Sequence, residues 1–102
     1  MTTNICKGAY GWQAETHIPL EGGRHLSITT SKAGGNLRAR AQAYRIENGF
    51  RTFLIFSDFS KSVAQSDTRC TEKTVASLHR QALARLDEIK ADVAAFYAAK
   101  GE

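Results

Sequence analysis

The stretch LRARAQAYRIENGFRTFLIF, residues 37–56, holds two different hydrophobic patterns on either side of a turn signal. In its first half, small apolar side chains alternate with polar or charged ones, which is the period-2 pattern of a strand with one buried face. In its second half, TFLIF, large apolar side chains follow one another and the alternation ends. We therefore expect two neighbouring strands, of which residues 37–46 have one dry face and residues 51–59 have two.

Two further glycine-rich segments, LEGGRH and KAGGNL, separate alternating stretches of sequence in the same way as ENGF does. Glycine and asparagine reach positive φ at little cost, so all three segments are typical of β-hairpin turns. Three turns join four strands, which we expect at residues 10–20, 24–32, 37–46 and 51–59. The polar segment SKSVAQSDTRC, residues 60–70, is expected to be a connection.

The register of the first two hairpins follows from their turns, because a slip of one residue would send every side chain to the opposite face. With Gly34 and Gly35 as a two-residue loop, the predicted pairs are Thr30 with Ala39, Ile28 with Ala41 and Leu26 with Ala43. With residues 21–23 as a three-residue loop, the predicted pairs are Ile18 with Leu26, Thr16 with Ile28 and Ala14 with Thr30. Both choices gather apolar side chains on one face.

The third turn, at Asn48 and Gly49, leaves two registers open. A two-residue loop sets Ala43 opposite Leu54, whereas a three-residue loop sets Ala43 opposite Phe53. In either register two large apolar side chains of the fourth strand project from the other face of the sheet. Leaving them in water would forgo several kcal/mol, so something should cover them: the segment 60–70 folded back, a second copy of the protein or a foreign partner, of which we favour the second copy.

The last third of the chain has the pattern of an amphipathic helix. Its apolar residues recur at spacings of three and four, namely Val75, Leu78, Ala82, Leu86, Ile89, Val93 and Phe96. Thr71 is placed to cap the N-terminus, and Gly101 is a natural stop. We therefore expect one long helix over residues 71–99.

Together these elements predict a single α+β domain over residues 1–102, in which a four-stranded antiparallel meander is followed by one long C-terminal helix packed on one sheet face. The helix should cover the face with the alanines of the third strand, because a row of methyl groups lets a helix approach closely. The opposite face should be polar, with side chains from Gln13, Glu15, His17, His25, Ser27, Thr29, Ser31, Arg38, Arg40, Gln42 and Tyr44.

Composition narrows the class of partner. The 102 residues carry a net charge of +4 and a calculated pI of about 9.3, which suits nucleic acid or an acidic protein surface. No apolar run has the form of a signal peptide or a membrane span, so we expect a cytoplasmic protein without a membrane partner. Cys6 and Cys70 are too few for a disulfide framework and are expected to be reduced thiols.

The sequence holds none of the motifs that would indicate an enzyme: no phosphate-binding loop, dinucleotide fingerprint, paired zinc histidines or nucleophile elbow. We therefore expect no catalytic residue, no metal and no cofactor. His17, His25 and Glu15 stand on adjacent outward positions, and whether they bind a metal or assist a metal-free ribonuclease stays open. His79 is expected to be a boundary residue that packs against the sheet.

Arginine and aromatic side chains on the polar face favour single-stranded nucleic acid as the partner, since guanidinium groups bind phosphates and rings stack on bases. The residues expected to bind it are Arg38, Arg40, Tyr44, Gln42, Lys32 and Arg51. Leu54, Phe56 and Phe59 are expected to form the interface of a homodimer. The alternative is a protein-interaction module, such as a small inhibitor, adaptor or assembly subunit, that uses the apolar fourth strand and the same face.

Overall fold

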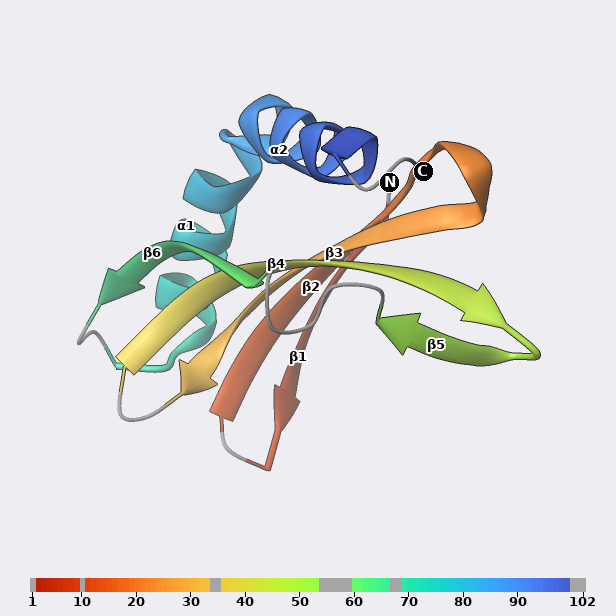
Figure 1. Ribbon diagram of the computed structural model, residues 1–102. Helices are drawn as coiled ribbons and strands as arrows, with labels where there is room; N and C mark the ends of the chain where they lie inside the picture. The colour runs from red at the N-terminus through yellow and green to blue at the C-terminus, as the bar shows by residue number, and fades with distance from the viewer. Residues whose placement is uncertain (1, 10, 34–35, 54–59, 67–68, 100–102) are drawn as a thin grey trace.

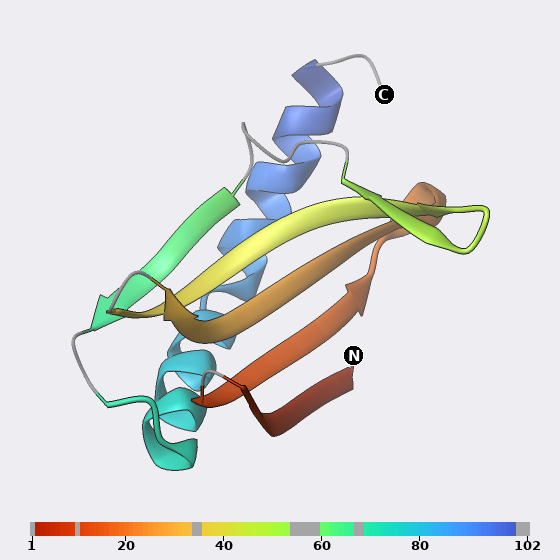
Figure 2. The same cartoon turned by 90° about the horizontal axis from the view of Figure 1, so that it is seen from below.

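The computed structural model describes residues 2–9, 11–33, 36–53, 60–66 and 69–99, and the described chain forms one antiparallel sheet with two consecutive helices on one face (Figures 1 and 2). The strands are β1 Thr2–Gly8, β2 Gly11–Pro19, β3 Arg24–Ala33, β4 Asn36–Glu47, β5 Phe50–Phe53 and β6 Ser60–Ser66. A 3-10 turn, η1, spans Glu21–Gly23, and the helices are α1 Glu72–Leu83 and α2 Leu86–Ala99. The predicted α+β class, with an antiparallel meander followed by C-terminal helix, is confirmed.

The predicted registers of the first two hairpins are confirmed pair by pair. In the β2–β3 hairpin Thr16 lies opposite Ile28, and in the β3–β4 hairpin Ile28 lies opposite Ala41. The third turn is the two-residue one, since Glu47 pairs with Phe50. Asn48 and Gly49 both have positive φ, of 53° and 80°, as a type I′ turn requires.

Two strands were not predicted. β1 pairs with β2 at one edge of the sheet, where Thr3 lies opposite Thr16. β6 pairs with the first half of β4, so the expectation that residues 60–66 form a connection is wrong. Neither segment shows a clean alternation of apolar and polar residues. β1 has few apolar residues on the face that it shares with the core side of β2. In β6, Val63 falls at a bulge where the β4–β6 register shifts.

Only the first part of the predicted fourth strand, residues 51–59, lies within the described part of the chain. β5 ends at Phe53, opposite Tyr44, and β6 begins at Ser60, opposite Gln42. Both strands therefore use the same edge of β4, on either side of Ala43. Residues 54–59 lie outside the described part of the chain, and with them Leu54, Phe56 and Phe59 of the predicted interface.

The C-terminal segment forms two helices where one was predicted. Thr71 caps α1 as expected, because its side chain accepts a hydrogen bond from the Thr74 amide at 3.2 Å in a capping box. The chain turns at Ala84. There the Arg85 amide donates to the Ala82 carbonyl at 3.0 Å, a hydrogen bond that spans three residues as in a 3-10 helix, where an α-helix spans four. Arg85 then pairs with Glu88 in the first turn of α2, at 2.7 Å. The break changes which ring is buried near the C-terminus, since Tyr97 is buried and Phe96 only half-buried.

The helices pack on the sheet face that the sequence predicted. We call this the inner face; its core residues are Ala14, Ile18, Leu26, Ile28, Leu37, Ala39, Ala41 and Ala43, which pack against Val75, Leu78, Ala82, Ile89, Val93 and Tyr97. The three alanines of β4 are at most 1% exposed. We call the opposite sheet face, which no described helix covers, the outer face (Figure 2). Neither helix in the described ranges is long and apolar enough to cross a lipid bilayer.

Candidate nucleic-acid interface

Arg38 and Arg40 occupy alternate positions on β4 and therefore share the outer face. They lie opposite Ser31 and Thr29 of β3, on the side away from the buried alanines. Arg40 is exposed and Arg38 is half-buried. Within the described residues no ion pair with either guanidinium is found, and Nε of Arg38 is buried without a hydrogen-bond partner there.

Gln42 follows Arg40 at the next outward position, where it lies opposite Ser27. Its side chain is half-buried, whereas Ser27 is only 5% exposed and donates to Glu15 at 3.3 Å. Amide and hydroxyl groups thus surround the arginines. Such groups bind phosphate and sugar oxygens in known nucleic-acid interfaces, but they also suit an ordinary solvated sheet face.

Tyr44 is placed on the outer face as predicted, but its side chain is fully buried. Its ring stacks on that of His25, with centroids 5.3 Å apart, and meets the His17 ring edge-on at 5.4 Å. Its hydroxyl lies 2.5 Å from Nε2 and 3.0 Å from Nδ1 of His17, and it can bond to only one of them. The expectation that Tyr44 offers an open ring for base stacking is therefore not met.

His17 and His25 lie together as expected, but Tyr44, and not Glu15, is the third residue of their group. Nε2 of His17 lies 3.2 Å from Nδ1 of His25, and both imidazoles are half-buried. Tyr44 completes the group, while Glu15 accepts a hydrogen bond from Ser27. Among the described residues, no three His, Cys, Asp or Glu side chains are grouped so as to hold a metal ion.

Two other predicted contact residues lie apart from the arginines. Lys32 pairs with Leu37, a core residue, so the register places it on the helix side at the end of β3, where it is exposed. It was expected near a turn, and it lies on the opposite side of the sheet from Arg38 and Arg40. Arg51 pairs with Ile46, and its side chain is outside the described set.

A cavity of about 230 Å³ opens at the end of the sheet beyond Arg38. Its lining consists of Gly8, Ala9, Gly11, Trp12, Gln13, Ser31 and Lys32. The residues come from the β1–β2 hairpin and the end of β3, and Ser31 is the residue that pairs with Arg38. The cavity therefore adjoins the outer face.

Trp12 is held in this cavity wall through its backbone. The Cys70 thiol donates a hydrogen bond to the Trp12 carbonyl at 2.9 Å. A Cβ at Gly11 would lie 3.1 Å from the Cys70 sulfur, and Gly11 has a φ of +114°, so this close approach requires glycine. Nothing in the sequence pattern shows that Trp12 and Cys70, which are 58 residues apart, meet.

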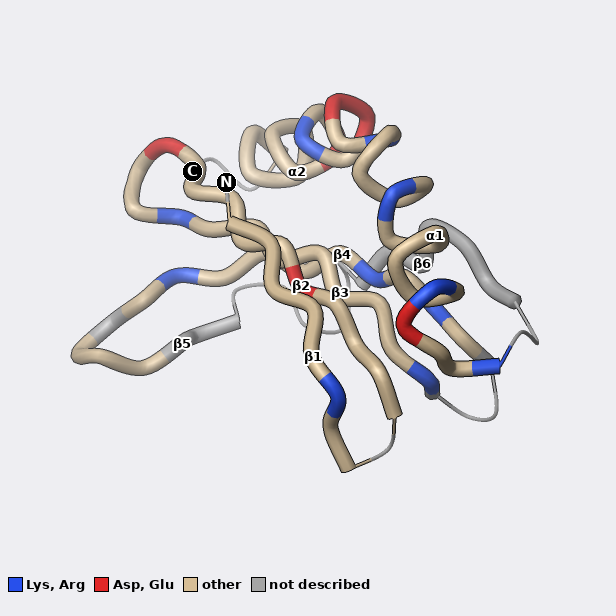
Figure 3. The backbone as a smooth tube through the Cα atoms, turned by 180° about the vertical axis from the view of Figure 1, so that it is seen from behind, with Lys and Arg blue, Asp and Glu red and all other residues tan. Residues whose placement is uncertain are grey.

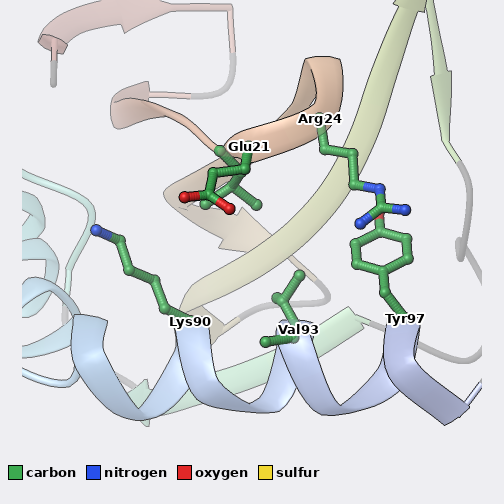
Figure 4. A pocket seen from close by; sticks show the side chains of 7 residues that line it. Glu21, Arg24, Lys90, Val93 and Tyr97 are labelled. Atoms are coloured by element: carbon green, nitrogen blue, oxygen red, sulfur yellow. The ribbon is translucent and has the colours of Figure 1, made fainter. Parts of the chain in front are cut away.

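A second cavity, of about 220 Å³, lies between α2 and the β2–β3 turn (Figure 4). The Arg24 guanidinium sits 3.8 Å from the centroid of the Tyr97 ring, in a cation–π contact. Val93 and Lys90 line the same cavity, and Glu21 stands at its rim. Since Arg24 already occupies one face of the Tyr97 ring, this contact joins the turn to α2.

The third histidine, His79, lies on α1 and faces the inner side of the sheet. It is 2% exposed, with Nε2 2.6 Å from the Thr16 hydroxyl and Nδ1 2.8 Å from the Thr30 hydroxyl. Burial lowers the pKa of His79 below its ordinary value. A neutral imidazole can donate through one nitrogen and accept through the other, so this residue joins the helix to two strands as a structural group.

Acidic and basic residues are distributed differently over the sheet and the helices (Figure 3). Acidic residues lie mostly on the helices and the β2–β3 turn, with Glu15 the one that the outer face carries among its described positions. Lysine and arginine are spread over both layers. The outer face therefore has a local excess of positive charge without a dense basic patch.

No family model, curated protein or solved structure matches this chain.

Proposed function

We propose that this protein binds single-stranded nucleic acid on its outer face and has no catalytic role. The observation that carries the proposal is the placement of Arg38 and Arg40 on alternate positions of a sheet face that the helices leave uncovered, with no described ion pair. Guanidinium groups along a strand can follow a phosphate backbone, and the surrounding hydroxyl and amide groups can bind its sugars. The net charge of +4 favours the approach of such a partner.

The test is fluorescence anisotropy with a labelled single-stranded oligonucleotide at several salt concentrations. Log affinity should fall with log salt by about 0.7 for each phosphate neutralised. The double variant Arg38→Ala with Arg40→Ala should bind more weakly and lower this slope by about 0.7 for each arginine removed.

The matched control is Lys73→Ala with Arg80→Ala, which removes the same charge from exposed positions on α1. It should bind as the parent does. Failure of the parent to bind at low salt would refute the proposal, and equal losses in both double variants would show that only overall charge matters.

The proposal includes a homodimer in the cytoplasm. In support, the β4–β5 hairpin projects from the body of the sheet (Figure 1), and its tip exposes 47% of Ile46 and 76% of Phe50. Large apolar groups on an exposed hairpin are typical of an interaction surface. Light scattering of the parent and of Phe50→Asp tests this part: a dimer that the variant splits is expected, and a monomeric parent contradicts it.

The same exposed tip favours the second candidate, a protein-interaction module whose partner contacts Ile46 and Phe50. In that case Phe50→Asp would abolish capture of a defined protein from a cell extract. The Arg38 and Arg40 variant would leave that capture intact, so the two candidates separate cleanly.

A further inference from the structure

We infer that the cavity beside Trp12 holds one unstacked base of the bound strand, an inference that rests on the proposed function. Binding to single strands usually combines cationic groups with a ring on which a base stacks. Tyr44 is fully buried, so a stacking ring must come from elsewhere. Trp12 shares the helix side of β2 with Ala14 and packs in part against the core, but it is only half-buried and also lines the cavity of about 230 Å³ at the end of the sheet.

The lining of the cavity suits a nucleotide. The indole of Trp12 supplies an aromatic surface, and the Gln13 amide and Ser31 hydroxyl can each donate and accept hydrogen bonds. Lys32 is exposed at the same site and supplies a cation for a phosphate. None of the described residues that line the cavity is acidic.

The position of the cavity connects it to the arginines. Ser31 lies opposite Arg38, and Arg40 follows two residues further along β4. A strand that crosses the outer face along Arg40 and Arg38 therefore reaches Ser31 and then the cavity. Lys32, which the register places on the helix side, lines the cavity at this end of the sheet.

Gly8 leaves space in the cavity beside Gln13. A Cβ at Gly8 would lie 3.7 Å from the Gly11 carbonyl oxygen and 3.9 Å from the side-chain amide of Gln13, within the lining of the cavity. A larger side chain at this position would extend toward the space that a base needs. Unlike Gly11, Gly8 has no positive φ, so it can be replaced without backbone strain.

The second cavity is the less suitable site for a base. Its ring, Tyr97, is already covered on one face by Arg24 at 3.8 Å, and Glu21 at its rim would repel a phosphate. It also lies on the helix side at the β2–β3 turn, away from Arg38 and Arg40.

Trp12 is the single tryptophan of the chain, so its fluorescence reports on this cavity directly. Titration with a short oligodeoxythymidine should quench the emission in parallel with the anisotropy change of the labelled strand. Trp12→Leu and Gly8→Leu should each weaken binding at least about fivefold, the lower end of what one stacked base contributes. Trp12→Phe should retain most of the affinity because it keeps a ring.

The matched control is Thr2→Leu, which places the same leucine side chain at an exposed position at the other end of β1. It should bind as the parent does. Circular dichroism shows whether each variant folds. If Trp12→Leu does not fold, the binding affinity of Gly8→Leu tests the inference, because that variant keeps the Trp12 ring.

Two outcomes overturn the inference in different ways. If the oligonucleotide binds by anisotropy while the tryptophan emission stays constant and Gly8→Leu binds as the parent does, the base lies elsewhere and the proposed function stands. If the parent does not bind the oligonucleotide at low salt, the proposed function fails and the inference fails with it.

Discussion

The two faces of the sheet each carry a histidine-containing polar cluster, and the two clusters differ in what surrounds them. On the inner face His79 is enclosed between α1 and the hydroxyls of Thr16 and Thr30. On the outer face His17 and His25 are half-buried around Tyr44, with no described helix above them. The comparison teaches that polar groups under the helices hold the fold together, whereas those on the outer face are within reach of a partner.

The largest difference in stability should appear between two variants that each place an arginine on β4, one on the inner face and one on the outer face. Ala41 is fully buried, so Ala41→Arg should destabilise the domain by about 4 kcal/mol or more, through overpacking and an unpaired charge. Gln42→Arg, its neighbour on the outer face, should change stability by about 0.5 kcal/mol at most. Urea denaturation measures both, and equal losses would mean that the outer face is as tightly covered as the inner one.

Removing one histidine from each cluster should give the next largest difference. His79→Leu leaves the buried Thr16 and Thr30 hydroxyls without their imidazole partner, which should cost about 2–4 kcal/mol of unfolding free energy. His25→Leu removes a half-buried ring and should cost about 1 kcal/mol or less. If the order of the two losses were reversed in denaturant melts, the outer cluster would be the structural one.

The dependence of stability on pH sharpens the same contrast. The pKa of His79 is lowered in the folded state, so below its ordinary value of 6.5 the unfolded chain binds a proton that the folded chain does not. Stability that is fully present above pH 6.5 should therefore decline as the pH falls toward the folded pKa, by up to about 1.4 kcal/mol per pH unit. The His79→Leu variant should lack this component, and an unchanged pH profile would show that another group causes the decline.

The smallest expected effect concerns the contact between the β2–β3 turn and α2. Arg24→Gln removes the cation from the Tyr97 ring, which should lower stability by about 0.5–1 kcal/mol. Lys90→Gln removes a cation from the same cavity without a ring contact described for it, and serves as the control. An equal loss of stability in both variants would show that the overall charge, and not the cation–π contact with Tyr97, causes it.

The parts of the fold that were predictable are those in which a local rule and a burial pattern agree. Glycine-containing turns determine register, and the alternation of alanine with arginine in β4 determines which face is buried. Ala41 and Arg40 were therefore assigned to the correct faces from the sequence alone.

The missed features depend on contacts between distant segments. β1 and β6 become strands because β2 and β4 offer free edges, and their own sequences alternate poorly. The turn at Ala84 occurs in a segment without glycine or proline, so no local signal announces it. In the candidate site, the approach of Cys70 to Gly11 joins residues far apart in sequence and defines the wall that holds Trp12.

The sharing of one β4 edge by β5 and β6 has a consequence for how this protein can change. β5 takes its register from the Asn48–Gly49 turn, and β6 takes its own from pairs such as Ala39 with Ala64. Because each strand is aligned by its own contacts, a change that loosens one of them need not shift the pairs of the other.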